Sequence, residues 1–358
     1  MWQKKVTTVT RLVKKVTDKV SPSARAQRRA FASLRTRFYT DFWKKAAAGI
    51  GADIEDMGSS WFLIKKEGNS TFVHGERVML DTAVTLELAG DKALVYRLLQ
   101  EDGFPVPQSL VFTLETIEAA YQFQQKIKGD VVVKPMDSWA GQGVTVNIKT
   151  PEALKKAAIH ASQYGHQLLI ENHIQGDSYR LLFLNGEFLD AVRRDSPQIV
   201  GDGKSTVKQL VKLENEARTS KQETTALSPL HIDADCKRTL KELNISLNSV
   251  PASGEKIVIK KVANQNTKFE NHGVRDQVHP DIIALGRDVS TLYRVELAGL
   301  DLITTDISKP LSETGGVINE INTTPGLHHH FLVSNENDAV QSGELVLDYI
   351  LKKYPINR

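Results

Sequence analysis

Apolar and polar residues follow two periods along this chain, and stretches of each period succeed one another from about residue 41 onward. Apolar residues three or four apart predict helices, while short runs rich in β-branched residues predict strands. The predicted helices cover residues 42–48, 91–99, 114–127 and 151–163, and dominate 205–245 and 279–298. The predicted strands cover residues 61–65, 71–73, 109–112, 130–135, 144–148, 167–171, 179–184 and 187–193. Asn185-Gly186 predicts a hairpin turn between the last two. The mixture indicates an α+β fold.

The first forty-five residues have a different pattern. Valines and a leucine between Val6 and Val16 recur at helical spacing, which predicts an amphipathic basic helix. Residues 21–23 break it, and a second basic helix is expected through Phe31, Leu34 and Phe38. Three interpretations stay open: a helix packed on its own protein or a partner subunit, a helix on an anionic membrane surface or other polyanion, and an organellar presequence.

Two late strands carry hard oxygen ligands. The run 315–322 ends in Glu320-Ile-Asn322, whose two polar side chains share one face of a strand because they are two residues apart. The earlier apolar run 299–303 carries Asp301. Two carboxylates and an amide on adjacent strands suit Mg²⁺. The alternative is that both are ordinary core strands whose polar ends face solvent, because such strands have the same sequence pattern. Asp306 competes with Asp301, but its odd spacing places it on the other face.

A lysine and a glycine-bearing loop follow the strand at 130–135. Lys134 ends the strand, and Gly141 and Gly143 lie in the loop that leads to the next one. Glycines let a backbone approach a polyphosphate closely, and successive N–H groups can bind its oxygens. A plain hairpin turn is the alternative. Residues 201–206 are not a P-loop, because Gln198 stands where that motif needs a glycine.

The strand at 167–171 leads into a polar turn. A strand that links two lobes can offer backbone N–H and C=O groups to an adenine edge, but any strand between lobes can do this. Asp177 could accept hydrogen bonds from ribose hydroxyls. Five cationic side chains follow: Arg180, Arg193, Arg194, Lys260 and Lys261. Alternation puts each adjacent pair on opposite faces. One member of each pair is therefore expected to face a cleft and the other solvent, unless both have surface roles.

Composition narrows the class of protein. The 358 residues are 41% hydrophobic and 25% charged, as in a soluble globular protein of two or three lobes. Cys236 is the single cysteine, which excludes an internal disulfide framework and fits a reducing compartment. The net charge of +3 conceals an asymmetry. Residues 1–45 carry thirteen Lys or Arg and two Asp, a net +11, which leaves −8 on the rest.

Taken together, these segments resemble the ATP-grasp superfamily from about residue 91 to 331. The likeness is closest to the ATP-grasp domain of cyanophycin synthetases and related carboxylate–amine ligases. The residues that carry it are, in chain order, 91–94, 103–107, 133–135, 141–144, 179–180, 201–206, 278–280, 299–301, 306–308, 320–322 and 325–326.

The resemblance implies an ATP-grasp fold, in which two α/β lobes clasp ATP. A basic helical extension at residues 1–40 and a short N-terminal domain at 41–107 would precede the lobes. The small lobe would cover 108–174, and the large lobe with its metal site 175–358.

The resemblance also implies roles for individual residues. Lys92 and Lys134 would contact the phosphates and base, and the loop from Ser138 through Gly141 and Gly143 would close over the triphosphate. Glu171 and Ile174 would supply backbone contacts to adenine, with Asp177 near the ribose. Arg194 would neutralise the transferring phosphoryl group, and Arg180 and Lys261 are further expected catalytic cations. Asp301, Glu320 and Asn322 would hold Mg²⁺, for which Mn²⁺ is an alternative.

The implied activity is ATP-dependent amide formation through an acyl phosphate, with amino acids or small peptides as substrates. Two alternatives stay open: a ligase that modifies a protein or peptide and holds an acidic partner through residues 1–40, and a non-catalytic nucleotide-binding module at a membrane. A cytoplasmic location is expected, with peripheral membrane contact and homo-oligomerisation left open and no specific nucleic acid partner.

His328–His330 stand where relatives usually carry Arg and one His, so the acid and the amine stay unidentified. These adjacent histidines do not readily converge on one metal ion, so metal binding is not favoured. The favoured roles are carboxylate binding and lid packing.

Overall fold

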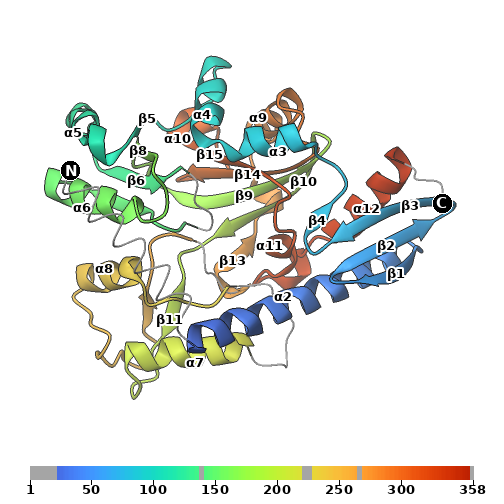
Figure 1. The fold of residues 1–358 in the computed structure, drawn as a ribbon, viewed down its shortest axis with the longest axis horizontal. Helices are drawn as coiled ribbons and strands as arrows, with labels where there is room; N and C mark the ends of the chain where they lie inside the picture. Colours follow the sequence, from blue (N-terminus) through green and yellow to red (C-terminus); the bar gives the residue numbers. More distant parts are fainter. Residues whose placement is uncertain (1–21, 137–140, 220–227, 264–267, 355–358) are drawn as a thin grey trace.

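The structure is a computed structural model that describes residues 22–136, 141–219, 228–263 and 268–354 (Figure 1). Within these residues the strands form four sheets. A five-stranded central sheet occupies the middle of the molecule in Figure 1. The four-stranded sheet of residues 53–78 lies to its right in that view. A small lobe and a two-stranded unit lie to the left of the view, and between them they frame a cleft described below.

The N-terminal part is one long helix, α2 (Pro22–Gly49), followed by an antiparallel sheet. Its strands are β1 (Asp53–Gly58), β2 (Trp61–Lys66), β3 (Asn69–His74) and β4 (Arg77–Val78). Apolar residues of α2 at positions 38, 39, 42, 43, 46 and 47 are buried against this sheet and α12 (Ser342–Lys353). Because this stripe continues past residue 41, the two helices expected on either side of it form one helix. The boundary expected at residue 40 lies inside that helix.

The basic N-terminal segment is therefore partly a core element. From Leu34 onward its apolar side chains pack on the protein itself, which fits the first of the three interpretations for that stretch. The helix expected between Val6 and Val16 lies outside the described residues.

The small lobe is a four-stranded antiparallel sheet with two helices. Its strands, in the order β5-β8-β6-β7, are β5 (Ser109–Phe112), β8 (Leu168–Asn172), β6 (Val131–Pro135) and β7 (Thr145–Ile148). The short turn η1 (Leu114–Thr116), α5 (Ile117–Lys126) and α6 (Pro151–Ala161) supply the residues that are buried against it. Thr150 caps α6, and its hydroxyl accepts from the N–H of Ala153. The strands and helices predicted for residues 109–171 are confirmed to within a few residues.

The central sheet is antiparallel, in the order β13-β10-β9-β14-β15. The strands are β9 (Asp177–Leu184), β10 (Glu187–Arg194), β13 (Asn271–Gly273), β14 (Leu297–Thr304) and β15 (Val317–Thr323). The predicted hairpin turn is confirmed, because β9 and β10 pair across Asn185-Gly186. The helices and turns near this sheet are α3 (Ala83–Gly90), α4 (Lys92–Glu101), η2 (Lys268–Glu270), η3 (Arg275–Gln277), α9 (Pro280–Leu292), α10 (Leu311–Thr314), α11 (His328–Phe331) and η4 (Glu336–Asp338).

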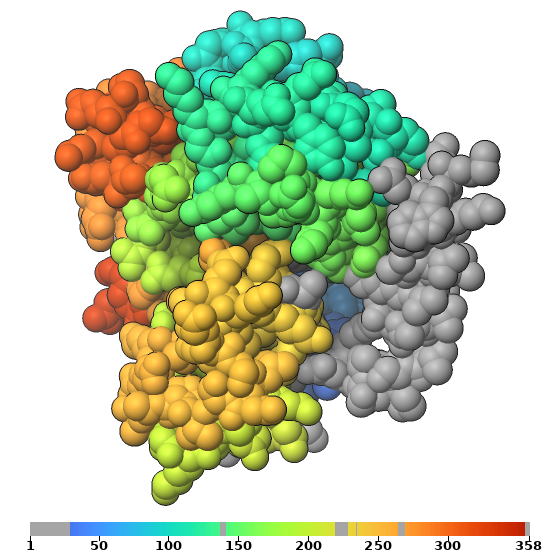
Figure 2. All heavy atoms as spheres, turned by 90° about the vertical axis from the view of Figure 1, so that its left-hand side faces the viewer, coloured from blue at the N-terminus to red at the C-terminus, as the bar shows by residue number. Residues whose placement is uncertain are grey.

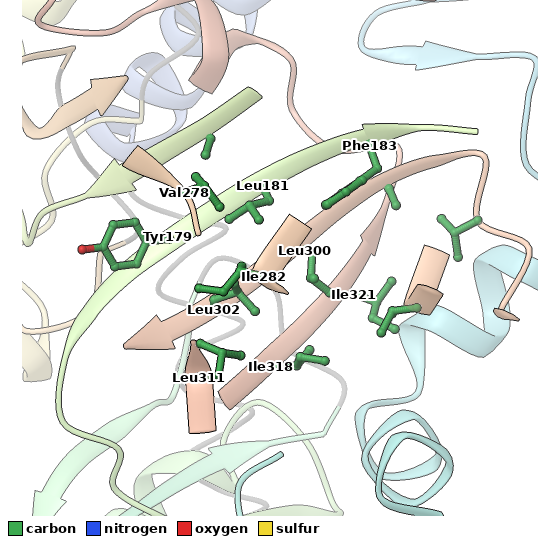
Figure 3. Packing of buried hydrophobic residues seen from close by; sticks show 14 of the residues in the cluster. Tyr179, Leu181, Phe183, Val278, Ile282, Leu300, Leu302, Leu311, Ile318 and Ile321 are labelled. Atoms are coloured by element: carbon green, nitrogen blue, oxygen red, sulfur yellow. The ribbon is translucent and has the colours of Figure 1, made fainter. Parts of the chain in front are cut away.

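One face of the central sheet is an apolar core. Figure 3 shows Tyr179, Leu181 and Phe183 of β9 in one layer with Leu300 and Leu302 of β14. Side chains of α9 and α10 fill the layer. The packing is so close at Gly286 of α9 that a Cβ there would lie 2.2 Å from the ring of Phe183. The intervening residues of the same strands point to the opposite face. There Arg180 and Asp301 line the cleft, whereas Leu182, Leu184 and Leu297 are buried against the N-terminal part of the chain.

The two-stranded unit consists of β11 (Gln198–Val200) and β12 (Lys256–Val258) with α7 (Val207–Thr219) and α8 (Ala234–Glu242). Asp233 caps α8 by accepting from the N–H of Cys236, as expected for a cysteine at a helix start. Cys236 is buried, and burial raises the pKa of its thiol to about 11. In the part of the chain that the structure describes, no helix combines the length and the apolar run that crossing a bilayer requires.

Candidate active site

A cleft of about 1290 Å³ opens between the small lobe, the central sheet and the β11–β12 unit. Figure 2 shows the small lobe in green directly above the segment around α8 in yellow. The two are joined where Arg238 of α8 donates to the hydroxyl of Thr145 at 3.2 Å. Charged residues from β6, β8, β9, β14 and β15 line the cleft.

Two arginines converge on one carboxylate at the floor of the cleft. Arg180 holds Asp301 with a bidentate pair of hydrogen bonds, Nε to Oδ1 at 2.6 Å and Nη2 to Oδ2 at 2.7 Å. Arg194 Nη1 lies 3.6 Å from the same Oδ2. Strand register explains the meeting, because Asp301 of β14 lies directly opposite Arg180 of β9. All three side chains are at most 10% exposed.

The electrostatics of this group favour a further anion. Burial alone would raise the pKa of Asp301, but the neighbouring guanidinium groups of Arg180 and Arg194 outweigh it and lower that pKa. Burial and the nearby Arg180 lower the pKa of Arg194 to about 10. The Nε of Arg194 is buried and has no hydrogen-bond partner among the described residues, and its Nη2 donates to the carbonyl of Ala263 at 2.7 Å. A buried donor without a partner costs about 1–3 kcal/mol. An anionic ligand that accepts a hydrogen bond from Nε would remove this free-energy cost.

The neighbouring strand supplies the oxygen ligands predicted for a cation. Glu320 of β15 is paired in register with Asp301 of β14, and Asn322 follows on the same face. Glu320 meets Lys92 at 3.0 Å, and the amide nitrogen of Asn322 donates weakly to the carbonyl of Gly299 at 3.4 Å. Among the described residues no three His, Cys, Asp or Glu gather into a metal-binding group. The set here is two carboxylates and an amide oxygen, which suits Mg²⁺ together with ligand phosphates.

A second buried network joins the small lobe to β15. Lys134 Nζ of β6 lies 2.8 Å from Oε2 of Glu171 and donates to the hydroxyl of Tyr96 at 3.1 Å. That hydroxyl donates in turn to the carbonyl of Asn319 at 2.8 Å. Lys134 and Glu171 are less than 10% exposed. Burial, and after it the charge of Glu171, raises the pKa of Tyr96 well above its usual value, so its proton stays in place.

Parts of this chain are similar to known proteins. Residues 102–226 match the family model of the prokaryotic glutathione synthetase ATP-grasp domain. The chain is 30% identical to cyanophycin synthetase of Trichormus variabilis over 306 residues, which are 81% of this chain and 34% of that protein. It is 25% identical to the glutathione biosynthesis bifunctional protein GshAB of Clostridium perfringens over 275 residues, which are 75% of this chain and 35% of that protein.

Among solved structures, a bifunctional glutathione synthetase from Pasteurella multocida has the same fold. Its TM-score is 0.57 at 22% identity, over 88% of this chain and 45% of that chain. The chain has the ATP-grasp fold and contains a segment, residues 102–226, that matches an ATP-grasp domain. The resemblance and the α+β fold expected from the sequence are thereby confirmed. The chain spans about a third of the length of the curated relatives it matches.

The ATP-grasp cleft brings together most of the residues singled out from the sequence. Those that line it are Lys92, Lys134, Gly141, Glu171, Ile174, Asp177, Arg180, Arg194, Lys261, Asp301, Glu320 and Asn322. Ser138 lies outside the described residues. Gly143 is not among the lining residues. It has a positive φ of 78°, and a Cβ there would lie 2.7 Å from the ring of Tyr164, so this glycine permits the tight turn behind the loop.

Alternation distinguishes the members of each cationic pair. Arg194 is buried against Asp301, whereas Arg193 is 36% exposed and pairs with Asp195 at 3.0 Å. Lys260 is buried and meets Asp233 at 2.6 Å, whereas Lys261 reaches the cleft and pairs with Glu242.

Two features of the site were missed or only partly described by sequence reasoning. Glu171 was expected to act through its backbone, but its buried side chain pairs with Lys134. Tyr96 was not singled out, although its position four residues after Lys92 on α4 places both on one helix face.

Asp306, the rival ligand, lies beyond the end of β14 and is not among the residues that line the cleft. Its carboxylate accepts hydrogen bonds from the N–H and the hydroxyl of Ser308.

The histidine segment forms the short helix α11 beside the cleft. Nδ1 of His328 lies 2.8 Å from the hydroxyl of Tyr39, and Nδ1 of His330 lies 2.7 Å from Asp190. His329 turns to the cleft, and its Nδ1 is buried with no hydrogen-bond partner in the part of the chain that the structure describes. Burial lowers the pKa of His328 and of His329 well below the usual value, so both are neutral near pH 7.

Proposed function

We propose that this chain is an ATP-dependent carboxylate–amine ligase whose substrates are amino acids or small peptides. The observation that carries the proposal is the convergence of Arg180 and Arg194 on Asp301, beside Glu320 and within the cleft that Lys134 also lines. Such a group places buried positive charge where a phosphoryl group and a carboxylate could meet.

ATP and Mg²⁺ are the cofactors that this site fits. Glu320 and Asn322, with Asp301, would hold the cation, and Lys134 and Lys92 would meet the phosphates. The bound Mg²⁺ would draw charge from the phosphate oxygens and so favour phosphoryl transfer. Glu171 would hold Lys134 in place through their 2.8 Å contact.

The chemistry proposed at the floor of the cleft overcomes the poor reactivity of a carboxylate. The γ-phosphoryl group of ATP would pass to a substrate carboxylate oxygen and give ADP and an acyl phosphate. Arg194, with its unpartnered Nε, would hold the charge that builds up on the transferring group. The nitrogen of the amine would then attack the carbonyl carbon, and phosphate would leave with the surplus proton. Burial of the site would limit hydrolysis of the acyl phosphate.

One incubation tests the proposal. The protein would be mixed with Mg-ATP and pooled amino acids and dipeptides, and the products would be identified by mass spectrometry. We expect ADP, phosphate and a condensation product in equal amounts. Phosphate release without any amide product across the pool would contradict it.

A matched pair of variants tests whether the chemistry belongs to this site. Arg194→Gln removes the buried guanidinium, and Arg97→Gln makes the same change at an exposed position of α4 outside the cleft lining. Loss of one such donor costs about 10²–10³ in rate, so we expect that loss in Arg194→Gln and near wild-type rate in Arg97→Gln. Equal effects of the two changes would contradict the assignment.

A further inference from the structure

The N-terminal helix α2 contributes a charged side chain to the cleft. Arg35 lines it together with Gly326, His328 and His329. These three residues come just after β15 and almost three hundred positions after Arg35 in the sequence. α2 is held there by the hydrogen bond between Tyr39 and His328 at 2.8 Å. Phe38 also packs edge-on against Phe331, with ring centroids 6.1 Å apart. The position of Arg35 is therefore set by the core and not by a free surface helix.

The polar groups at this end of the cleft keep hydrogen-bonding capacity for a ligand. The guanidinium of Arg35 packs over the ring of Tyr39 at 5.7 Å, and its Nη2 meets Glu76 at 3.3 Å. Arg35 and Glu76 are each about a third exposed, so water screens that pair and a ligand can compete with it. Nδ1 of His329, by contrast, is buried and finds no hydrogen-bond partner within residues 22–136, 141–219, 228–263 and 268–354. The rings of His328 and His329 lie 4.1 Å apart, which fixes both orientations.

The chemistry of these groups suits a carboxylate. An arginine presents a planar fork of donors that matches two carboxylate oxygens, and a neutral imidazole can add one N–H donor. This end adjoins the Asp301 group, where the reacting carboxylate is assigned, because the charges of Arg180 and Arg194 act on His329. Asn322 leads directly through Pro325-Gly326 to His329, so the two ends lie along one chain segment.

We propose that Arg35 and His329 bind the non-reacting carboxylate of the amino-acid or peptide substrate. This rests on the proposed ligase function and narrows its substrate class: one of the two substrates must carry a free carboxylate besides the group that reacts. A simple amine combined with a simple monocarboxylic acid would leave Arg35 without a ligand.

The test uses binding, so it does not depend on turnover. The full-length protein would be loaded with Mg²⁺ and a non-hydrolysable ATP analogue and mixed with pooled amino acids and dipeptides, or with the same pool as C-terminal amides. Ligand-observed NMR would identify the bound members and titration would give their dissociation constants. The variants are Arg35→Gln, Arg35→Lys and His329→Gln, with Arg37→Gln as the control because Arg37 is an exposed residue of the same helix.

We expect binding of free-carboxylate members and at least about tenfold weaker binding of the matching amides, the factor that one charge-assisted hydrogen bond gives. Arg35→Gln should bind the free-carboxylate ligand more weakly by a similar factor, and Arg35→Lys should weaken it less. Arg37→Gln should bind it with wild-type affinity. His329→Gln keeps a hydrogen-bond donor of similar reach, so its affinity should fall least among the cleft variants. Thermal melts would show that each variant is folded.

Three outcomes would overturn this proposal: amides that bind as well as free carboxylates, equal affinities in Arg35→Gln and Arg37→Gln, or no member of the free-carboxylate pool bound. A parallel assay of amide formation separates the two proposals. Arg35-dependent binding without any product would contradict the ligase function alone. Product formation that is indifferent to Arg35 would contradict the carboxylate site alone.

Discussion

The two faces of the central sheet are built from alternate residues of the same strands, and they differ most at the end that borders the cleft. On one face, the apolar face, Leu181 and Leu302 belong to a closed apolar core. On the other, the charged face, Arg180 and Asp301 stand next to them in sequence and form a buried ion pair at the floor of the cleft. Farther along the same face, Leu182 packs in a second apolar core with the N-terminal part of the chain. At the cleft, one strand thus places apolar packing on one side and charge on the other, with a period of two.

The largest effect should come from breaking the charged face at its centre. Asp301→Ala leaves Arg180 and Arg194 buried without their shared counter-ion. Removing one partner of a buried pair costs about 3–5 kcal/mol, so we expect a loss of that size in the free energy of unfolding, together with loss of ligation. Urea unfolding and amide formation would be measured, with Asp306→Ala as the exposed control. An unchanged unfolding midpoint for Asp301→Ala would show that the pair does not support the fold.

The matching change on the apolar face should affect stability alone. Leu302 is fully buried next to Asp301 in sequence, and truncating a buried leucine to alanine costs about 2–5 kcal/mol. We expect Leu302→Ala to unfold at lower urea concentration but to bind nucleotide with wild-type affinity while folded. Leu292→Ala at an exposed position of α9 is the control. A large loss of nucleotide affinity in folded Leu302→Ala would mean that the faces are not separable.

A smaller effect is expected where the small lobe meets the charged face. Tyr96→Phe removes the hydroxyl that accepts from Lys134 and donates to the carbonyl of Asn319. One buried hydrogen bond contributes about 0.5–1.5 kcal/mol, so we expect up to about tenfold weaker ATP binding by titration calorimetry. Tyr121→Phe on α5 should bind as wild type. Unchanged affinity in Tyr96→Phe would remove Tyr96 from the site.

A pH dependence of stability is expected from the two buried histidines beside the cleft. The pKa values of His328 and His329 are lowered in the folded protein, first by burial. The unfolded chain therefore takes up protons below about pH 6.5 that the folded protein does not. Stability should be present in full above that pH and fall as pH drops, by up to about 1.4 kcal/mol per pH unit for each histidine. Urea unfolding of His329→Gln should show a shallower slope; an identical slope would contradict the assignment.

Local pattern predicted much of the fold and part of the site. The two-residue period placed Glu320 and Asn322 on one face and separated Arg193 from Arg194, and Asn185-Gly186 predicted its hairpin, because these features depend on neighbours in sequence. The role of Arg35 depends on a helix packing against a segment almost three hundred residues away, and no local period reports such a contact. The buried pairing of Glu171 with Lys134 depends likewise on the register of β6 with β8.

The central claim is that the charged face activates a carboxylate by phosphorylation. Its most direct test is oxygen transfer: an acid substrate labelled with ¹⁸O in its carboxylate would be ligated in the presence of Mg-ATP, and the released phosphate would be analysed by mass spectrometry. The account predicts one ¹⁸O atom in each phosphate, with ADP as the other nucleotide product. Unlabelled phosphate, or label recovered in AMP, would contradict it.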